Sequence, residues 1–257
     1  RRPSPVVFPV SNLVREEMLK SYEIPEARIK VIHPGVLPER FSGFDRSACR
    51  HEIRTRHGLL SGDIVILFVG LNYKVKRLDL VFEGMAELLR RGNAGNSAKL
   101  LIVGKKPSHR FLSLARTLGI ADRCFFAGVT REIEKYYFAS DIFIMPSSYD
   151  TFGMVVLEAM MAGLPVIITE KVGAKDLIRS GTQGFVLGDR PSPMDIADRL
   201  AILLKRENRL SMGREARRTA SEHGWEKKGR LLAEMYRSLS GCSRQEVPLA
   251  EWNPQTV

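Results

Sequence analysis

The amino-acid sequence predicts an α/β protein with a doubly wound, Rossmann-like parallel sheet. From residue 63 onward, short apolar runs alternate with longer segments whose apolar residues recur at helical spacing. Parallel strands that helices cover on both faces show continuous apolar runs of this kind. Strands that alternate with amphipathic helices indicate repeated strand–helix–strand units, and these build an open parallel sheet.

The individual elements follow from the same patterns. The N-terminal part predicts a strand at 6–10, a helix at 12–22 that Ser11 caps, and a strand at 28–32. A linker rich in Pro and Gly separates it from an Arg-rich helix at 45–57. The alternating part then predicts strand 64–70, helix 77–91, strand 99–104, helix 110–118, strand 124–127, helix 132–139, strand 142–145, helix 152–162, strand 166–169, short helix 174–180, strand 184–187, helices 194–205 and 208–222, helix 225–238 and an irregular tail at 240–257.

The composition limits the classes of partner. A net charge of +11 on 257 residues permits a phosphorylated substrate, an anionic membrane surface or nucleic acid, or it serves solubility alone. Nucleic acid is disfavoured because no basic strand is interleaved with aromatic residues. No apolar run reaches the roughly 18 residues that span a bilayer, so membrane contact would be peripheral. Three widely separated cysteines, Cys49, Cys124 and Cys242, suit a reducing cytoplasm, and we expect a cytoplasmic location, with the inner face of the membrane left open.

The segment 147–168 carries the strongest functional signal. It predicts the end of a strand, a polar loop with Asp150, a helix that contains Glu158, and a second strand. A helix N-terminus offers free backbone N–H groups and a partial positive charge, which suit a phosphate. Glu158 lies about 9 Å from that N-terminus along the helix axis, at 1.5 Å per residue. The spacing indicates a nucleotide-sugar site. The alternatives are a loop or capping role for Asp150 and a solvated surface position for Glu158.

A basic loop follows the first strand of the alternating part. Gly70 would let a ligand approach the backbone closely, and Lys76 would hold a diphosphate as a mobile point charge. A second positive charge would have to come from Lys74 or Arg77. The alternative interpretation is a solvated basic loop without a ligand.

The segment 147–168 resembles the signature of the retaining glycosyltransferases of family 4, which have the two-domain GT-B fold. That signature is Glu, seven residues, Glu, and then Ala-Met-Ala-x-Gly-x-Pro-Val. The resemblance covers roughly residues 6–238. Within the family, the sequence is most similar in character to the lipopolysaccharide core glucosyltransferases. Asp150 departs from it, because the family has Glu there. Further matching segments are 30–36, 68–70 with Lys76, 101–104 and 125–129.

The resemblance implies roles for particular residues. Asp150 would contact the donor hexose hydroxyls, Glu158 the ribose hydroxyls, and Lys76 the diphosphate. These three residues are the expected catalytic set, and backbone groups near Val129 would hold the nucleobase. The donor phosphates would be cradled by the backbone amides of Phe152, Gly153, Met154 and Val155. No metal site is expected, since the five histidines are scattered and no Asp-x-Asp occurs, and no cofactor is expected besides the donor substrate, a UDP-sugar.

The resemblance also implies a domain plan. Residues 1–40 would be the tail of an N-terminal acceptor domain with its linker, 41–224 the donor-binding domain, and 225–257 a C-terminal helix and tail. The expected function is transfer of a hexose from a nucleotide sugar, UDP-glucose above others, to a glycan or glycolipid such as lipopolysaccharide core, with retention of configuration. Because most of the first domain would be absent, the chain is expected to bind donor but to transfer poorly. The alternatives are a nucleotide-sugar binding module and an epimerase on the same fold.

Overall fold

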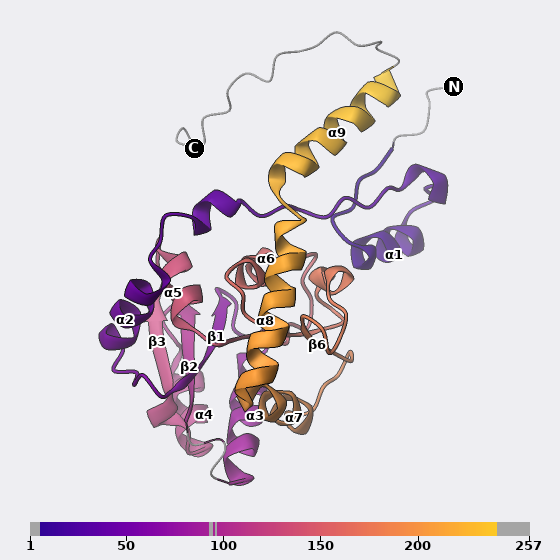
Figure 1. The fold of residues 1–257 in the computed structure, drawn as a ribbon. Helices are drawn as coiled ribbons and strands as arrows, with labels where there is room; N and C mark the ends of the chain where they lie inside the picture. Colours follow the sequence, from indigo (N-terminus) through magenta and orange to yellow (C-terminus); the bar gives the residue numbers. More distant parts are fainter. Residues whose placement is uncertain (1–5, 93–94, 96, 241–257) are drawn as a thin grey trace.

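A parallel sheet forms the centre of the computed structural model, which describes residues 6–92, 95 and 97–240 (Figure 1). Within these residues six strands pair in the order β3-β2-β1-β4-β5-β6, all parallel. The strands are β1 (Ile64–Gly70), β2 (Ala98–Gly104), β3 (Cys124–Gly128), β4 (Ile142–Met145), β5 (Val166–Thr169) and β6 (Gly184–Leu187). The predicted doubly wound α/β class is confirmed.

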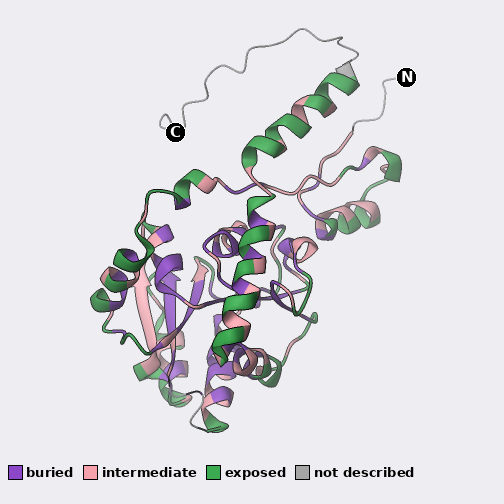
Figure 2. Cartoon of the chain, viewed as in Figure 1, coloured by how far each residue is buried: buried purple, intermediate pink, exposed green. Residues whose placement is uncertain are grey.

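Helices cover both faces of this sheet, and two apolar cores result. Successive strand residues point to opposite faces, so that Val65 and Leu67 enter one core and Ile66 and Phe68 the other. Figure 2 shows the central strands mostly buried, and the edge strand β3 half-buried, between partly exposed helices. The first face carries α2 (Arg46–Arg56), α5 (Ile133–Ala139), α6 (Met154–Met161) and α8 (Arg206–Ser221). The second face carries α3 (Leu78–Arg90), α4 (His109–Thr117) and α7 (Pro193–Leu204).

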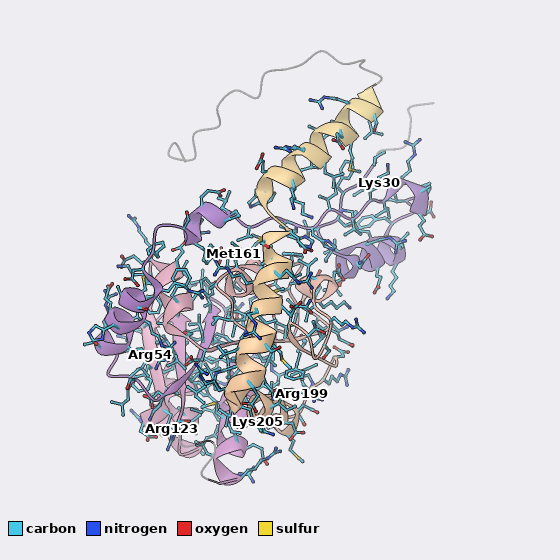
Figure 3. The ribbon with its side chains drawn as sticks, viewed as in Figure 1. Lys30, Arg54, Arg123, Met161, Arg199 and Lys205 are labelled. Atoms are coloured by element: carbon cyan, nitrogen blue, oxygen red, sulfur yellow. The ribbon has the colours of Figure 1, made fainter. Side chains whose placement is uncertain are left out.

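A buried arginine ties α2 to the sheet. Arg54, labelled in Figure 3, donates to the backbone oxygens of Ala139 at 3.0 Å and of Asp63 at 3.0 Å. Its Nη2 also donates to Oδ2 of Asp141 at 2.7 Å, and the same carboxylate oxygen accepts from the backbone N–H of Val65 at 2.8 Å. Because buried charges are costly unless they are paired and hydrogen-bonded, these contacts fix α2 against the starts of β1 and β4.

The N-terminal segment differs in part from its prediction. α1 (Asn12–Ser21) begins as predicted, with the Ser11 hydroxyl accepting from the N–H of Val14 at 3.3 Å. The strands predicted at 6–10 and 28–32 do not form as regular strands: within the described residues the two segments run parallel and make one bridge, between Val7 and Ile29, with a further backbone hydrogen bond from Ile32 to Pro9 at 2.9 Å. The physical reason is that two short strands without further partners are marginally stable.

The C-terminal helix α9 (Trp225–Ser240) extends away from the sheet beside the N-terminal segment (Figure 1). The ring of Tyr236 lies 6.2 Å from that of Phe8. The predicted tail at 240–257 falls, from residue 241 onward, outside the described residues. Within the described residues no helix combines the length and the apolar character that crossing a bilayer requires.

Most other boundaries agree with the predictions to within two residues, and strands β1, β4, β5 and β6 agree completely. The short helix predicted at 174–180 is present as a 3-10 helix, η5 (Gly173–Leu177), which begins one residue earlier and ends three residues earlier than predicted. Helix α6 begins at Met154, two residues later than predicted. Gly153 has φ +85°, a left-handed conformation outside the helical region, so the helix starts after it.

Candidate functional site

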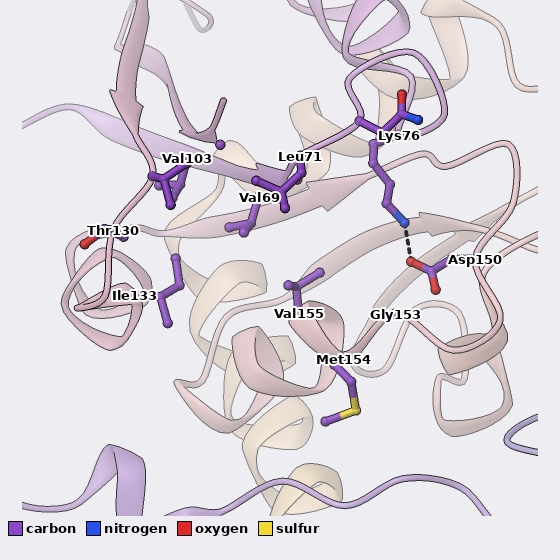
Figure 4. A pocket seen from close by; sticks show the side chains of 14 residues that line it. Val69, Leu71, Lys76, Val103, Thr130, Ile133, Asp150, Gly153, Met154 and Val155 are labelled. Carbon is purple, nitrogen blue, oxygen red and sulfur yellow. Dashed lines mark hydrogen bonds and ion pairs between the residues drawn. The ribbon is translucent and has the colours of Figure 1, made fainter. Parts of the chain in front are cut away.

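A pocket of about 450 Å³ lies at the carboxyl ends of the strands, beside the start of α6 (Figure 4). β1 lies between β2 and β4: the strands β2 and β3 are added on one side of it, and the strands β4 to β6 on the other. Ligands of open α/β sheets bind where the strand order reverses in this way. The lining residues come from the ends of β1 and β2, the loops after β1, β3 and β4, and the first turns of α5 and α6. They are Val69, Gly70, Leu71, Asn72, Lys76, Val103, Gly104, Val129, Thr130, Ile133, Asp150, Gly153, Met154 and Val155.

The loop after β1 directs Lys76 into this pocket. Lys76 N–H donates to the backbone oxygen of Asn72 at 2.9 Å, and the N–H of Leu78 donates to that of Tyr73 at 3.0 Å. The hydroxyl of Tyr73 donates to the backbone oxygen of Lys105, and burial raises the pKa of Tyr73 to about 12, so that it remains a donor. A Cβ on Gly70 would lie 3.0 Å from Cγ of Lys76. Gly70 is therefore the residue that leaves room for the lysine stem.

Lys76 and Asp150 form an ion pair at the pocket wall (Figure 4). Their side chains are 19% and 17% exposed, so both remain accessible from the pocket. The second oxygen of Asp150, Oδ1, accepts from the N–H of Phe152 at 3.2 Å, which directs the carboxylate. The backbone of Asp150 is held too, since its N–H donates to Lys171 at 2.8 Å and its oxygen accepts from Gly173 at 2.9 Å. The pair thus places one cation and one acceptor group side by side.

The N-terminus of α6 opens onto the same pocket. Met154 and Val155, its first two residues, both line the pocket. Among the described residues no side chain caps this terminus, so the first backbone N–H groups lack the usual side-chain acceptor. A Cβ on Gly153 would lie 2.9 Å from Cγ1 of Val172, so that a larger residue would disturb the turn. The terminus offers an anion both backbone donors and the positive end of a helix dipole.

Glu158 lies outside the lining of this pocket and is held by other side chains. Its Oε1 accepts from Nη1 of Arg40 at 3.0 Å, and its Oε2 accepts from the hydroxyl of Tyr137 at 2.9 Å. Burial and the neighbouring Glu158 carboxylate raise the pKa of Tyr137, which stays a donor. Burial lowers the pKa of Arg40, but the charges of Glu158 and Glu134 raise it by more, and the net shift is upward.

The ten predicted site residues divide into those that line the pocket and those that do not. The structure brings seven of them into one lining: Gly70, Lys76, Val129, Asp150, Gly153, Met154 and Val155. Val129 is 71% exposed at the rim. Lys74 and Phe152, like Glu158, are not part of the lining: Lys74 is exposed, and Phe152 is buried with its ring 6.0 Å from that of His33.

Sequence reasoning missed two kinds of residue. The polar lining residues Asn72 and Thr130 follow β1 and β3, and the rule that ligands sit after strand ends could have found them. Arg40 and Glu134, the partners that surround Glu158, carry no local signal. Within the described residues no three His, Cys, Asp or Glu side chains gather where they could hold a metal ion.

The sheet order and the pocket at the carboxyl ends of the strands define a Rossmann-like ligand-binding domain, and comparisons with known proteins identify its family. Residues 50–219 match the family model described as "Glycosyl transferases group 1". The chain therefore belongs to this glycosyltransferase family.

Individual relatives and structures agree with this family. A D-inositol 3-phosphate glycosyltransferase of Nocardia farcinica is 31% identical over 239 residues, which cover 88% of this chain and 51% of the relative. The chain thus spans about half the length of the curated relatives it matches. The crystal structure of WaaG, a glycosyltransferase involved in lipopolysaccharide biosynthesis, superposes with a TM-score of 0.76 at 24% identity, covering 86% of this chain and 60% of that one.

A second solved structure shows the same architecture. Anabaena HepE, in complex with UDP and glucose, superposes with a TM-score of 0.81 at 18% identity, covering 91% of this chain and 64% of that one. At these identities the two structures show a shared fold, that of GT-B glycosyltransferases.

Proposed function

We propose that this chain provides the donor-binding part of a retaining glycosyltransferase that takes a hexose from a UDP-sugar. The observation that carries the proposal is that Lys76, Asp150 and the uncapped N-terminus of α6 share one pocket. A cation and a helix terminus suit a diphosphate, and a carboxylate suits sugar hydroxyls. The UDP complex of Anabaena HepE supports uracil as the base.

The same residues have a role in the transfer step. The bond between the anomeric carbon and the diphosphate oxygen breaks, and the electron pair leaves with UDP. Lys76 and the first amides of α6 stabilise this developing negative charge, which is the main catalytic contribution that such a site makes. The acceptor hydroxyl oxygen bonds to the anomeric carbon on the face that UDP leaves, and its proton passes to the departing phosphate oxygen. This route retains the configuration and requires no protein nucleophile.

The acceptor is a glycan or another polyol that carries negative charge. The net charge of +11 favours such a molecule. The relatives support the class, because one of them is named for D-inositol 3-phosphate and WaaG is described as involved in lipopolysaccharide biosynthesis. Lipopolysaccharide core remains our first proposed acceptor.

Calorimetric titration of the chain with UDP, GDP and ADP, without added metal, tests donor binding. Lys76→Ala should weaken binding of the nucleotide by about 1.5–3 kcal/mol, the usual contribution of a hydrogen bond to a charged group. Lys106→Ala is the matched control, since Lys106 is an exposed lysine outside the lining and its loss changes the net charge equally. Absence of binding by all three nucleotides, or equal losses in both variants, would contradict the proposed site.

A transfer assay separates the enzyme from a binding module. The chain is incubated with UDP-glucose and lipopolysaccharide core, and released UDP is compared with sugar attached to the acceptor. Transfer supports the proposed reaction. Saturable donor binding with neither UDP release nor product fits both a binding module and the poor transfer expected of a chain that spans about half of its relatives. The same assay on the protein together with its acceptor-binding domain then decides, because donor binding without transfer there would favour the binding module.

A further inference from the structure

One guanidinium joins two carboxylates that come from different helices. Arg40 donates through Nε to Oε1 of Glu134 at 2.7 Å and through Nη1 to Oε1 of Glu158 at 3.0 Å. Glu134 and Glu158 side chains are only 9% and 13% exposed, whereas Arg40 is 42% exposed. Two nearly buried carboxylates that share a single cation leave an excess negative charge, and without that cation they would repel each other. Arg40 thus holds one oxygen of Glu158, and the hydroxyl of Tyr137 holds the other.

Packing places Arg40 where it can do this. It lies in the 3-10 turn η2 (Pro38–Phe41), between the N-terminal segment and α2 (Figure 1). The next residue, Phe41, is buried, with its ring 6.2 Å from Tyr137 and 6.1 Å from Phe138 of α5. The turn is thus anchored on α5 immediately beside Arg40.

The cluster adjoins the pocket on its α5–α6 side. Glu158 is three and four residues after Val155 and Met154, so it shares their side of α6, one turn further along. Glu134 directly follows Ile133, another lining residue. A molecule that fills the pocket and extends along α6 would therefore reach Glu158.

We propose that Arg40 is a positioning residue for nucleotide binding, and that it acts by orienting Glu158 toward the ribose hydroxyls of the donor. This inference rests on the proposed function of the pocket. A carboxylate has about four acceptor positions. Arg40 and Tyr137 each occupy one on Glu158, which leaves positions for two hydroxyls. Arg40 itself lies outside the lining of the pocket.

The alternative is an ordinary ion pair near the surface, which contributes roughly 0–1 kcal/mol to stability and nothing to binding. Titration of UDP into the wild-type chain and into Arg40→Ala, Arg40→Lys, Glu158→Gln and the Arg40→Ala/Glu158→Gln double variant distinguishes the two. We expect Arg40→Ala to weaken UDP binding about tenfold, which corresponds to about 1.4 kcal/mol. In the Glu158→Gln background the same change should alter affinity less than about twofold, because coupled residues are not additive.

Two further variants complete the design. Arg40→Lys keeps the charge but loses the forked geometry, and it should recover part of the affinity. Arg91→Ala is the control, because Arg91 also joins two carboxylates, Glu87 and Asp198, but lies at the end of α3 and outside the lining. Arg91→Ala should leave UDP affinity unchanged.

Each outcome decides the inference. Additive losses in the double variant, no rescue by lysine, or equal losses for Arg40→Ala and Arg91→Ala would overturn it while the donor site stands. Wild-type affinity in Glu158→Gln would also overturn it. If the wild-type chain binds none of UDP, GDP and ADP, the proposed function fails, and this inference fails with it.

Discussion

Substitution of Asp150 by Asn should affect UDP and UDP-glucose in opposite directions. The carboxylate of Asp150 forms an ion pair with the ammonium group of Lys76, and a diphosphate must share or replace that contact. Asn keeps an oxygen that can accept from the N–H of Phe152, so the loop geometry should persist. The substitution removes a negative charge beside the diphosphate and leaves Lys76 in place. UDP should therefore bind more tightly to the variant than to the wild type.

The magnitude follows from the charge that is removed. A phosphate in contact with Lys76 Nζ would lie roughly 6 Å from the Asp150 carboxylate, and Coulomb's law then gives about 1 kcal/mol per unit charge at an effective dielectric constant of about 50. This is about fivefold in Kd. For UDP-glucose the variant also loses hydrogen bonds from a charged acceptor to the hexose, at about 1.5–3 kcal/mol. UDP-glucose should therefore bind more weakly than to the wild type.

Calorimetry with both ligands at constant ionic strength measures these changes, because salt screens the charge effect. Asp79→Asn is the matched control, since Asp79 also pairs with a basic side chain, Arg77 at 3.3 Å, but does not line the pocket. It should leave both affinities unchanged. Weaker or unchanged binding of UDP to Asp150→Asn would refute the reasoning, as would an equal gain for both ligands.

Two predictions concern stability, and urea unfolding tests both. Arg54→Met should lower the free energy of unfolding by about 3 kcal/mol, because Asp141 loses a buried partner; a loss below about 1 kcal/mol would contradict this. Burial, with a smaller effect of the Lys228 charge, lowers the pKa of His223 to about 4, below the unfolded value of about 6.5. The unfolded state thus takes up this proton first, and stability should fall as the pH drops from about 6.5 towards 4. His223→Phe should reduce that pH dependence, and an unchanged slope between pH 7 and pH 5 would exclude His223 as its source.

The sequence was sufficient to predict the sheet and the part of the pocket that local segments build. The strands from β4 to β6 agree with their apolar runs, because a buried parallel strand must be apolar on both faces. The loop with Asp150 and the start of α6 lie within a few residues of each other. Their proximity in space follows from the chain itself.

The N-terminal segment shows where local patterns fail. The apolar residues at 6–10 and 28–32 satisfy the pattern of a strand, yet within the described residues the two segments share only a short parallel pairing. It has one bridge, Val7 with Ile29, and one further backbone hydrogen bond, from Ile32 to Pro9 at 2.9 Å. A strand is stable only with partners on its edges, and apolar character records burial without recording which segment is the partner. The pattern therefore predicted two extended segments, but not that their pairing would be too short to form regular strands.

Sequence alone determined the fold class, the position of the pocket at the strand ends, and the residue types around it. Tertiary structure alone decided the partners of the charged side chains. Lys76 meets Asp150 across 74 positions, and Arg40 meets Glu158 across 118. Such pairs leave no periodic signal, because a charged residue on a loop or helix looks the same in sequence whether it faces water or a partner. The chain path that brings them together depends on the packing of the whole sheet and its helices.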